Sequence, residues 1–270
     1  MTMSFLLRES PGDVDTTHDL GFSNAARAKA ASKKKQKSTI IGEKLRRPQV
    51  GVIVDRPRLI ALLDKSVNKF GATLVSGRAG TGKTTLAADF ASRSNNAVWY
   101  SVEPADSDWI EFTAYFRAAV RGGKQGRKYR TGGPAVHDPT QSQAAEFLAT
   151  CFREVEGLSK RERMLVILDN IHHLFDASWF SDLFRQLVVL AGANVHLLIL
   201  CRSRPPIPLW RFRSKQQLNV IDENMLEFTI PETRRLCKTR GLSESLASEA
   251  HQLAYGHVSK LIDALDDLTK

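Results

Sequence analysis

The stretch TLVSGRAGTGKTTLAADFAS, residues 73–92, decides how this chain is interpreted. Its first residues predict a short buried strand, and its last residues predict a helix with one apolar face. Between them lies GRAGTGKT, residues 77–84, which fits the pattern G-x-x-x-x-G-K-[ST] of a phosphate-binding loop. A strand before the loop and a helix after it are the context that phosphate binding by such a loop requires.

The residues of this loop have expected roles. Glycines let backbone N–H groups converge on phosphate oxygens, and the helix N-terminus adds the positive end of its dipole. Lys83 is expected to bridge the β- and γ-phosphates, and Thr84 to ligate magnesium through its hydroxyl. The sequence therefore predicts ATP or ADP with Mg²⁺ as the ligand. The predicted nucleotide-binding residues are Gly77, Arg78, Ala79, Gly80, Thr81, Gly82, Lys83, Thr84 and Thr85.

Two charged residues follow apolar strands further along the chain. Asp169 ends the predicted strand 164–168, and Arg202 ends the predicted strand 195–201. Asp169 suits a magnesium-side carboxylate together with Thr84, although an apolar strand ending in Asp is common in α/β proteins. Arg202 either senses the γ-phosphate or forms a surface ion pair. Lys83, Asp169 and Arg202 are the predicted catalytic set.

The remaining pattern predicts a three-layer α/β P-loop domain with a parallel sheet. Apolar runs alternate with amphipathic stretches from Val52 onward, including a strand at 98–102 and a helix after Asp108. After about Ile221 the strand signal disappears. Thr229-Ile230-Pro231-Glu232 then predicts a capped helix start, with breaks at Gly241 and Gly256. The predicted domains are 46–222 for nucleotide binding and 223–270 for a small helical unit.

Residues 1–45 are predicted to form a disordered basic arm. After Leu7 they hold few large apolar side chains, and lysines cluster at 33–37. The arm either contacts DNA, RNA or an acidic protein, or is a solvated tail. The glycine-rich stretch 122–134 is predicted to be a loop, either a mobile insertion or a binding loop.

Composition narrows the class of protein. The chain has 270 residues, and its 39 Lys and Arg outnumber its 29 Asp and Glu, a net charge of +10 that favours polyanionic partners. Its three cysteines are far apart, which argues against a disulfide framework or a zinc site, and Cys151 is expected to pack in the core. No apolar stretch approaches the ~18 residues of a membrane span, and no signal peptide is evident. The cytoplasm is the expected location.

The sequence resembles the nucleotide-binding module of a known family, the MalT-type regulators. These are the large LuxR-related branch of the STAND signal-transduction ATPases. The resemblance covers about residues 44–270 in the family's order and at similar spacings. The matching motifs are KLRRP (44–48), RPRL (56–59), GTGKTTL (80–86), WYSVEPADSD (99–108), Phe112, Tyr115, LDNIH (168–172), RSRP (202–205), LWRFR (209–213) and LEFT (226–229).

The resemblance implies a molecular switch. ADP holds such proteins closed, and ATP with an inducer allows self-assembly and activation of transcription. By the same analogy, residues 56–59 lie near the nucleotide base and Arg202 is the sensor arginine. The family's helical repeats and C-terminal helix-turn-helix do not appear before residue 270, where the sequence stops.

One departure from the family pattern concerns hydrolysis. Family members usually carry a second acidic residue after the magnesium aspartate, and here that position is Asn170, which cannot accept a proton from water. We therefore expect slow hydrolysis, unless Glu103 or Asp106 serves as the base. Two alternatives to the switch stay open: a DNA-associated helper ATPase resembling those that assist transposition, and a nucleotide-dependent partner scaffold without turnover.

Overall fold

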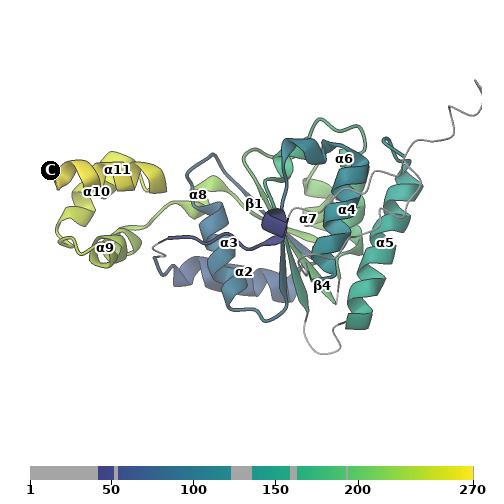
Figure 1. Cartoon of the computed structure of the whole chain (residues 1–270). Helices are drawn as coiled ribbons and strands as arrows, with labels where there is room; N and C mark the ends of the chain where they lie inside the picture. Colours follow the sequence, from purple (N-terminus) through teal and green to yellow (C-terminus); the bar gives the residue numbers. More distant parts are fainter. Residues whose placement is uncertain (1–41, 52–53, 123–135, 159–162, 193, 270) are drawn as a thin grey trace, which may run out of the picture. The chain divides into compact units, whose positions relative to one another are not determined.

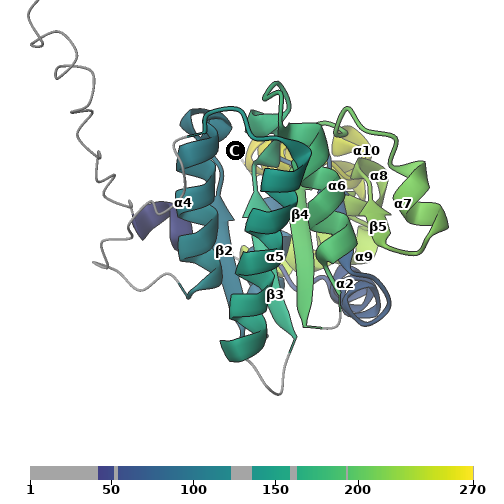
Figure 2. The ribbon, with the colours of Figure 1, turned by 90° about the vertical axis from the view of Figure 1, so that its right-hand side faces the viewer.

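A computed structural model describes residues 42–51, 54–122, 136–158, 163–192 and 194–269. The chain divides into two compact units, residues 1–36 and 37–270, and all described residues belong to the second. Its centre is a five-stranded sheet with the order β2-β3-β4-β1-β5, and every neighbouring pair of strands is parallel (Figure 2). The strands are β1 (Ala72–Ser76), β2 (Ala97–Ser101), β3 (Met164–Asp169), β4 (Val195–Cys201) and β5 (Leu218–Ile221).

Helices cover both faces of the sheet (Figure 1). On one face lie α2 (Pro57–Lys69) and α3 (Lys83–Ser92), and on the other α4 (Trp109–Val120), α5 (Gln141–Leu158) and α6 (Phe180–Leu190). Leu165 and Ile167 of β3 pack with α2 and α3, whereas Val166 and Leu168 pack with the second group. Alternate strand residues therefore fill two separate cores. The predicted three-layer α/β fold with a parallel sheet is confirmed.

Aromatic residues dominate the core under α4, α5 and α6. Trp109 lies 5.1 Å from Trp179 and 5.9 Å from Phe112, measured between ring centroids. Asp108 begins α4, and its side chain accepts a hydrogen bond from the N–H of Ile110. Cys151 is fully buried in this core, as predicted.

The described part of the chain begins with a short packed segment, the 3-10 helix η1 (Gly42–Leu45). Its Lys44 is 6% exposed and forms ion pairs with Glu103, at 2.8 Å, and Asp106, at 3.0 Å. Both partners lie at the 3-10 helix η2 (Pro104–Ser107), where Asp106 is fully buried. Residues 42–45, at the C-terminal end of the predicted arm, therefore pack against η2. The cause is that a buried carboxylate pairs with this lysine.

Several short elements were not predicted from the sequence, among them the following three. The 3-10 helix η3 (Ile171–Leu174) follows β3, and α7 (Trp210–Ser214) leads into the edge strand β5, beside which it packs (Figure 2). The short helix α8 (Glu223–Leu226) then connects the sheet to the C-terminal helices.

The C-terminal helices α9 (Ile230–Thr239), α10 (Leu246–Ala254) and α11 (Val258–Leu268) share a small apolar core. As predicted, Thr229 and Glu232 form a capping box at the start of α9, with proline in the first turn. The predicted breaks also coincide with left-handed glycines: Gly241 follows α9 and Gly256 precedes α11. Val54 contributes to this core, so the segment before α2 packs with the helical unit.

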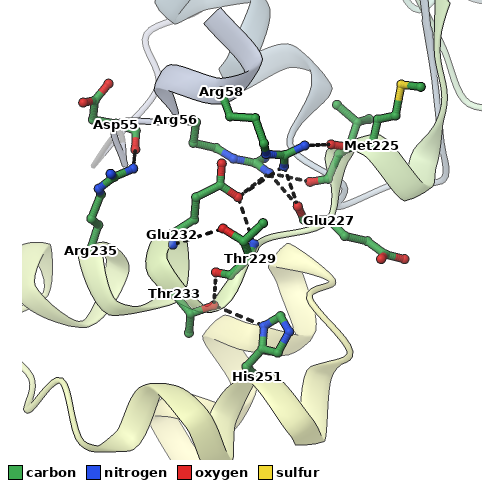
Figure 3. A network of polar contacts seen from close by, with 11 residues as sticks. Asp55, Arg56, Arg58, Met225, Glu227, Thr229, Glu232, Thr233, Arg235 and His251 are labelled. Atoms are coloured by element: carbon green, nitrogen blue, oxygen red, sulfur yellow. Dashed lines mark hydrogen bonds and ion pairs between the residues drawn. The ribbon is translucent and has the colours of Figure 1, made fainter. Parts of the chain in front are cut away.

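A buried polar network joins that segment to the helical unit (Figure 3). Arg56 donates to the carbonyl oxygens of Leu226, at 2.7 Å, and Glu227, at 2.9 Å, and to Glu232 Oε2, at 3.2 Å. Arg58 reaches Glu232 Oε2 at 3.3 Å from the exposed side. The Glu232 carboxylate of the capping box thus contacts two arginines, Arg56 just before α2 and Arg58 in its first turn.

Several other expectations concern the whole chain. The predicted arm up to residue 41 and nearly all of the loop 122–134 lie outside the described residues. Within the described part, no helix is long and apolar enough to cross a membrane. All three cysteines are buried and unbridged.

Candidate nucleotide-binding site

The loop between β1 and α3 has the backbone of a phosphate cradle. Gly80 and Gly82 adopt φ values of 77° and 81°, in the left-handed region that favours glycine, and Gly82 is the N-cap of α3. The N–H groups of residues 79–82 donate no hydrogen bond to any other described residue. Donors left open at the N-terminus of a helix are the groups that bind phosphate oxygens.

Lys83 lies at the start of α3 with its ammonium turned into the loop. Its Nζ donates to the carbonyl oxygens of Gly77, at 2.5 Å, and Arg78, at 2.7 Å, and to Thr81 Oγ1, at 3.1 Å. Burial lowers the pKa of this lysine, against the opposing effect of Asp169 nearby. The loop thus holds one cation beside its open N–H groups, an arrangement that suits an anionic ligand.

Thr84 and Asp169 meet at the carboxyl end of the sheet. Thr84 Oγ1 donates to Asp169 Oδ2 at 3.1 Å, and Asp169 is 3% exposed. Burial raises the pKa of this carboxyl, while the Thr84 hydroxyl and Lys83 oppose that shift. A hydroxyl and a carboxylate oxygen side by side are hard donors of the kind that Mg²⁺ takes alongside phosphate oxygens. The residues present therefore fit the predicted metal.

Arg202 occupies the neighbouring strand end. Ser76 and Cys201 are partners in the β1–β4 ladder, and the N–H of Gly77 donates to the carbonyl of Cys201 at 3.2 Å. Arg202 therefore comes next to the start of the loop. It is exposed, forms no ion pair with any described residue, and lines a cavity of about 260 Å³ with Gly77 and Glu223. The alternative of a surface ion pair at Arg202 thus finds no partner in the described part of the chain.

The helical unit touches the phosphate loop directly. The N–H of Ser259, in the first turn of α11, donates to the carbonyl oxygen of Gly80 at 3.3 Å. Ser259 Oγ lies 3.0 Å from His257 Nδ1, and a side chain on Gly80 would clash with Ser259, because its Cβ would lie 2.8 Å from that Oγ. A residue far along the chain therefore packs against the loop where phosphate is expected.

A second contact links the loop to α8. Arg78 Nε donates to Glu223 Oε1 at 2.8 Å, and the Arg78 N–H donates to Glu223 Oε2 at 3.0 Å. The guanidinium is 79% exposed, so this pair fixes geometry more than it adds stability. Sequence reasoning missed Glu223, Ser259 and His257, because no local motif marks residues that only the tertiary fold brings to the loop.

The residues after Asp169 add two polar groups. Asn170 has a φ of 59°, a left-handed conformation that Asn tolerates better than most residues. His172 follows in η3, and neither of its ring nitrogens, both buried, has a partner among the described residues. Burial, reinforced by His173 and Arg202, lowers the pKa of His172 to about 4. His172 is therefore neutral near pH 7. The sequence signals for it were its position four residues after an apolar run and its place in the LDNIH motif, neither of which indicated a role.

One of the two candidate bases is disfavoured by its surroundings. Asp106 is fully buried, accepts hydrogen bonds from Lys44 Nζ and the Glu103 N–H, and so is not placed to activate water. The side chain of Glu103 is 56% exposed, so water can reach its carboxylate. The guanidinium of Arg56 contacts the linker carbonyls and Glu232, and the position of residues 56–59 near the nucleotide base stays a prediction.

Comparison with known proteins gives a consistent picture. A family model described as "AAA ATPase domain" matches residues 55–200. The HTH-type transcriptional regulator MalT of Serratia proteamaculans is 27% identical over 219 residues, which are 79% of this chain and 23% of that protein. The chain thus spans about a quarter of that relative's length. The predicted resemblance to the MalT-type nucleotide-binding module is confirmed.

Comparison with solved structures finds partial likenesses at low sequence identity. A Walker-type ATPase of Pyrococcus abyssi is 11% identical, with a TM-score of 0.48, over 81% of this chain and 68% of that one. The Orc1 protein of Aeropyrum pernix, in complex with DNA, is 18% identical, with a TM-score of 0.48, over 80% of this chain and 59% of that one.

Proposed function

Because the chain belongs to the family of AAA ATPase domains, we propose that it binds ATP or ADP with Mg²⁺ and acts as a slow switch ATPase of the MalT type in transcription regulation. One observation carries the proposal: Thr84 and Asp169 meet 3.1 Å apart beside a loop with open N–H groups and an inward-turned lysine. These are the parts that a P-loop ATPase requires.

The phosphates would be held by the loop itself. The N–H groups of residues 79–82 and the N-terminus of α3 would bind their oxygens, and Lys83 would leave the carbonyls of Gly77 and Arg78 to bridge the β- and γ-phosphates. Thr84 and Asp169 would hold Mg²⁺, which offsets phosphate charge when bound. Arg202, at the next strand end and without an ion pair among the described residues, would contact the γ-phosphate and report its presence.

Hydrolysis would be slow because no carboxylate follows Asp169. Asn170 can orient a water molecule through its amide but cannot take the proton, and a general base typically contributes about 100- to 10,000-fold. Slow turnover suits a switch, because each nucleotide state then persists.

The switch itself would act through the helical unit. Ser259 donates to Gly80 in the loop, and Arg78 of the loop is bound to Glu223 of α8. A phosphate that reshapes the loop would alter both contacts at once, so the seating of α11 would depend on the bound nucleotide. The relative's printed name supports transcription regulation as the output, and self-association and a cytoplasmic location belong to the same proposal.

Hydrogen exchange tests the switch. The amides of residues 257–261 should exchange at different rates with ADP-Mg²⁺ and with a slowly hydrolysed ATP analogue, while amides in β3 and β4 should not change. Equal exchange in both states would contradict a switch and leave a nucleotide-binding scaffold. Single-turnover hydrolysis with and without a DNA duplex separates the helper ATPase, whose turnover should rise with DNA.

A further inference from the structure

A strongly basic surface lies beside β5, C-terminal to Arg202, and its Arg204 also lines the cavity that Gly77 and Arg202 share. It comprises Arg204, Trp210, Arg211, Arg213 and Lys215, and we call it the α7 surface. Residues 202–217 include five cations and no acidic residue. All five members of the α7 surface are exposed. Positive charge is therefore concentrated on one short segment.

The cations of the α7 surface are unpaired, unlike many others in this chain. Within the described residues, Arg204, Arg211, Arg213 and Lys215 form no ion pair. Other arginines with exposed or half-buried side chains do, as in Arg58–Glu232, Arg78–Glu223, Arg93–Asp89, Arg121–Glu154, Arg185–Asp182 and Arg240–Asp266. The nearby carboxylate of Asp222 instead caps α8, where it accepts the Met225 N–H at 3.3 Å. The α7 surface thus keeps its full charge available for an anionic partner.

An exposed tryptophan stands among these cations. Trp210 is 66% exposed, and the Arg211 guanidinium carbon lies 5.5 Å from its ring centroid. Leaving so large an apolar ring in water gains nothing for folding, since its burial would be favourable. A planar ring flanked by guanidinium groups is the platform on which nucleic-acid bases stack.

A cavity of about 320 Å³ adjoins the tryptophan. Its apolar walls include Ile207, Val220 and Met225. Its polar lining consists of Arg204, Arg213 and one carboxylate, Asp222, which caps α8. This volume is at the small end of the range of about 300–1,000 Å³ that small ligands occupy, so it has room for a single planar base. The two arginines are placed to neutralise phosphates on either side of that base.

We propose that the α7 surface binds single-stranded nucleic acid, with one base stacked on Trp210 and the flanking phosphates on Arg204, Arg211 and Arg213. A flat ring beside a small apolar cavity favours a base over an acidic peptide, which would use the charges but not the ring. A duplex fits poorly, because its bases are already stacked and α7 is only roughly 7.5 Å long for its five residues. Single-stranded binding goes beyond the proposed nucleotide switch.

Fluorescence anisotropy of a labelled 20-nucleotide single strand, titrated with the full chain at low salt, tests this proposal. Trp210→Ala should weaken binding roughly 5- to 150-fold, since stacking one base is worth about 1–3 kcal/mol. Arg211→Ala/Arg213→Ala should also weaken binding, and the slope of log affinity against log salt should become shallower by about 0.7 for each phosphate that the variant no longer neutralises. The matched control, Arg93→Ala/Arg185→Ala, removes two paired surface arginines elsewhere and should change the affinity less than threefold.

Three results would overturn the proposal. They are no binding of the single strand, equal binding by wild type and Trp210→Ala, and displacement of the strand by poly-glutamate at equal charge concentration. The second would assign binding to the basic N-terminal residues, and the third would indicate an acidic protein partner. Lys83→Ala should bind the strand as wild type does, so failure of the nucleotide assignment and failure of the α7 surface are separable.

Discussion

Replacing Arg56 by alanine should destabilise the junction between the nucleotide domain and the helical unit. The guanidinium is buried and forms three hydrogen bonds, two to linker carbonyls and one to Glu232, and it stacks 4.2 Å from the Phe228 ring centroid. The alanine variant would leave the Glu232 carboxylate, 3% exposed in its side chain, without its buried partner. Uncompensated buried charge is among the few causes of large losses of stability.

The size of the loss follows from what remains around Glu232. Removing one partner of a buried ion pair typically costs about 3–5 kcal/mol. Glu232 would keep the Thr229 N–H, at 2.9 Å, and Arg58, at 3.3 Å, so the lower end of the range applies. We therefore expect a loss of about 3 kcal/mol in the free energy of unfolding. Arg58 contacts the same oxygen with a side chain that is 44% exposed, so Arg58→Ala should cost under about 1 kcal/mol.

Urea unfolding followed by circular dichroism measures both variants. With an m-value of about 3 kcal/mol/M, Arg56→Ala should lower the urea midpoint of unfolding by about 1 M. Arg58→Ala should lower it by a third of that or less. Burial would raise the pKa of Glu232, but the Thr229 N–H and Arg56 together lower it. The Arg56–Glu232 pair therefore contributes to the stability of the fold above pH about 4.3. This contribution is lost as the pH falls through the lowered pKa of Glu232. Equal losses of unfolding free energy in Arg56→Ala and Arg58→Ala would refute this account of the junction. So would a difference between wild type and Arg56→Ala that does not shrink in acid.

Three further predictions concern the nucleotide site and its support. Asn170→Asp should raise the single-turnover rate of hydrolysis about 100-fold or more with little change in ATP affinity, because Asp supplies a base and also tolerates a φ of 59°. If Asn170→Asp leaves the rate unchanged and Glu103→Gln abolishes it, the base is Glu103. Asp169→Ala should remove the dependence of ATP affinity on Mg²⁺, and calorimetry with an equal magnesium effect in the variant would exclude it as a ligand. Asp106→Asn should cost about 3 kcal/mol in urea unfolding, since Lys44 stays buried; a loss below about 1 kcal/mol would show that the ion pair contributes little.

Much of the fold could be predicted because its signals are local. The apolar runs 73–75, 98–102, 164–168 and 195–201 each became a strand, and the phosphate loop lies between a strand and a helix as its motif requires. The approach of Thr84 and Asp169 could also be predicted, since parallel strands bring their carboxyl ends to one edge. Strand β5 was missed because four residues, including the polar Asn219, give almost no periodic signal at a sheet edge.

Contacts between distant segments could not be predicted. Lys44 belongs to a basic stretch, which is typical of solvated residues. In the structure it is buried and forms ion pairs with Glu103 and Asp106. The contact of Ser259 with Gly80 depends on how the helical unit packs, and neither residue type indicates it. Such pairings depend on tertiary contacts that no single stretch of sequence encodes.

Calorimetric titration of ATP-Mg²⁺ and ADP-Mg²⁺ into wild type and Lys83→Ala tests the central claim most directly. The wild-type chain should bind both nucleotides. The variant should lose most of its ATP affinity with an unchanged circular dichroism spectrum, because the ammonium of Lys83 serves phosphate charge and contacts only the loop. Binding of ATP-Mg²⁺ by the variant as tight as that of wild type, or no binding by wild type, would contradict a nucleotide site at residues 77–84.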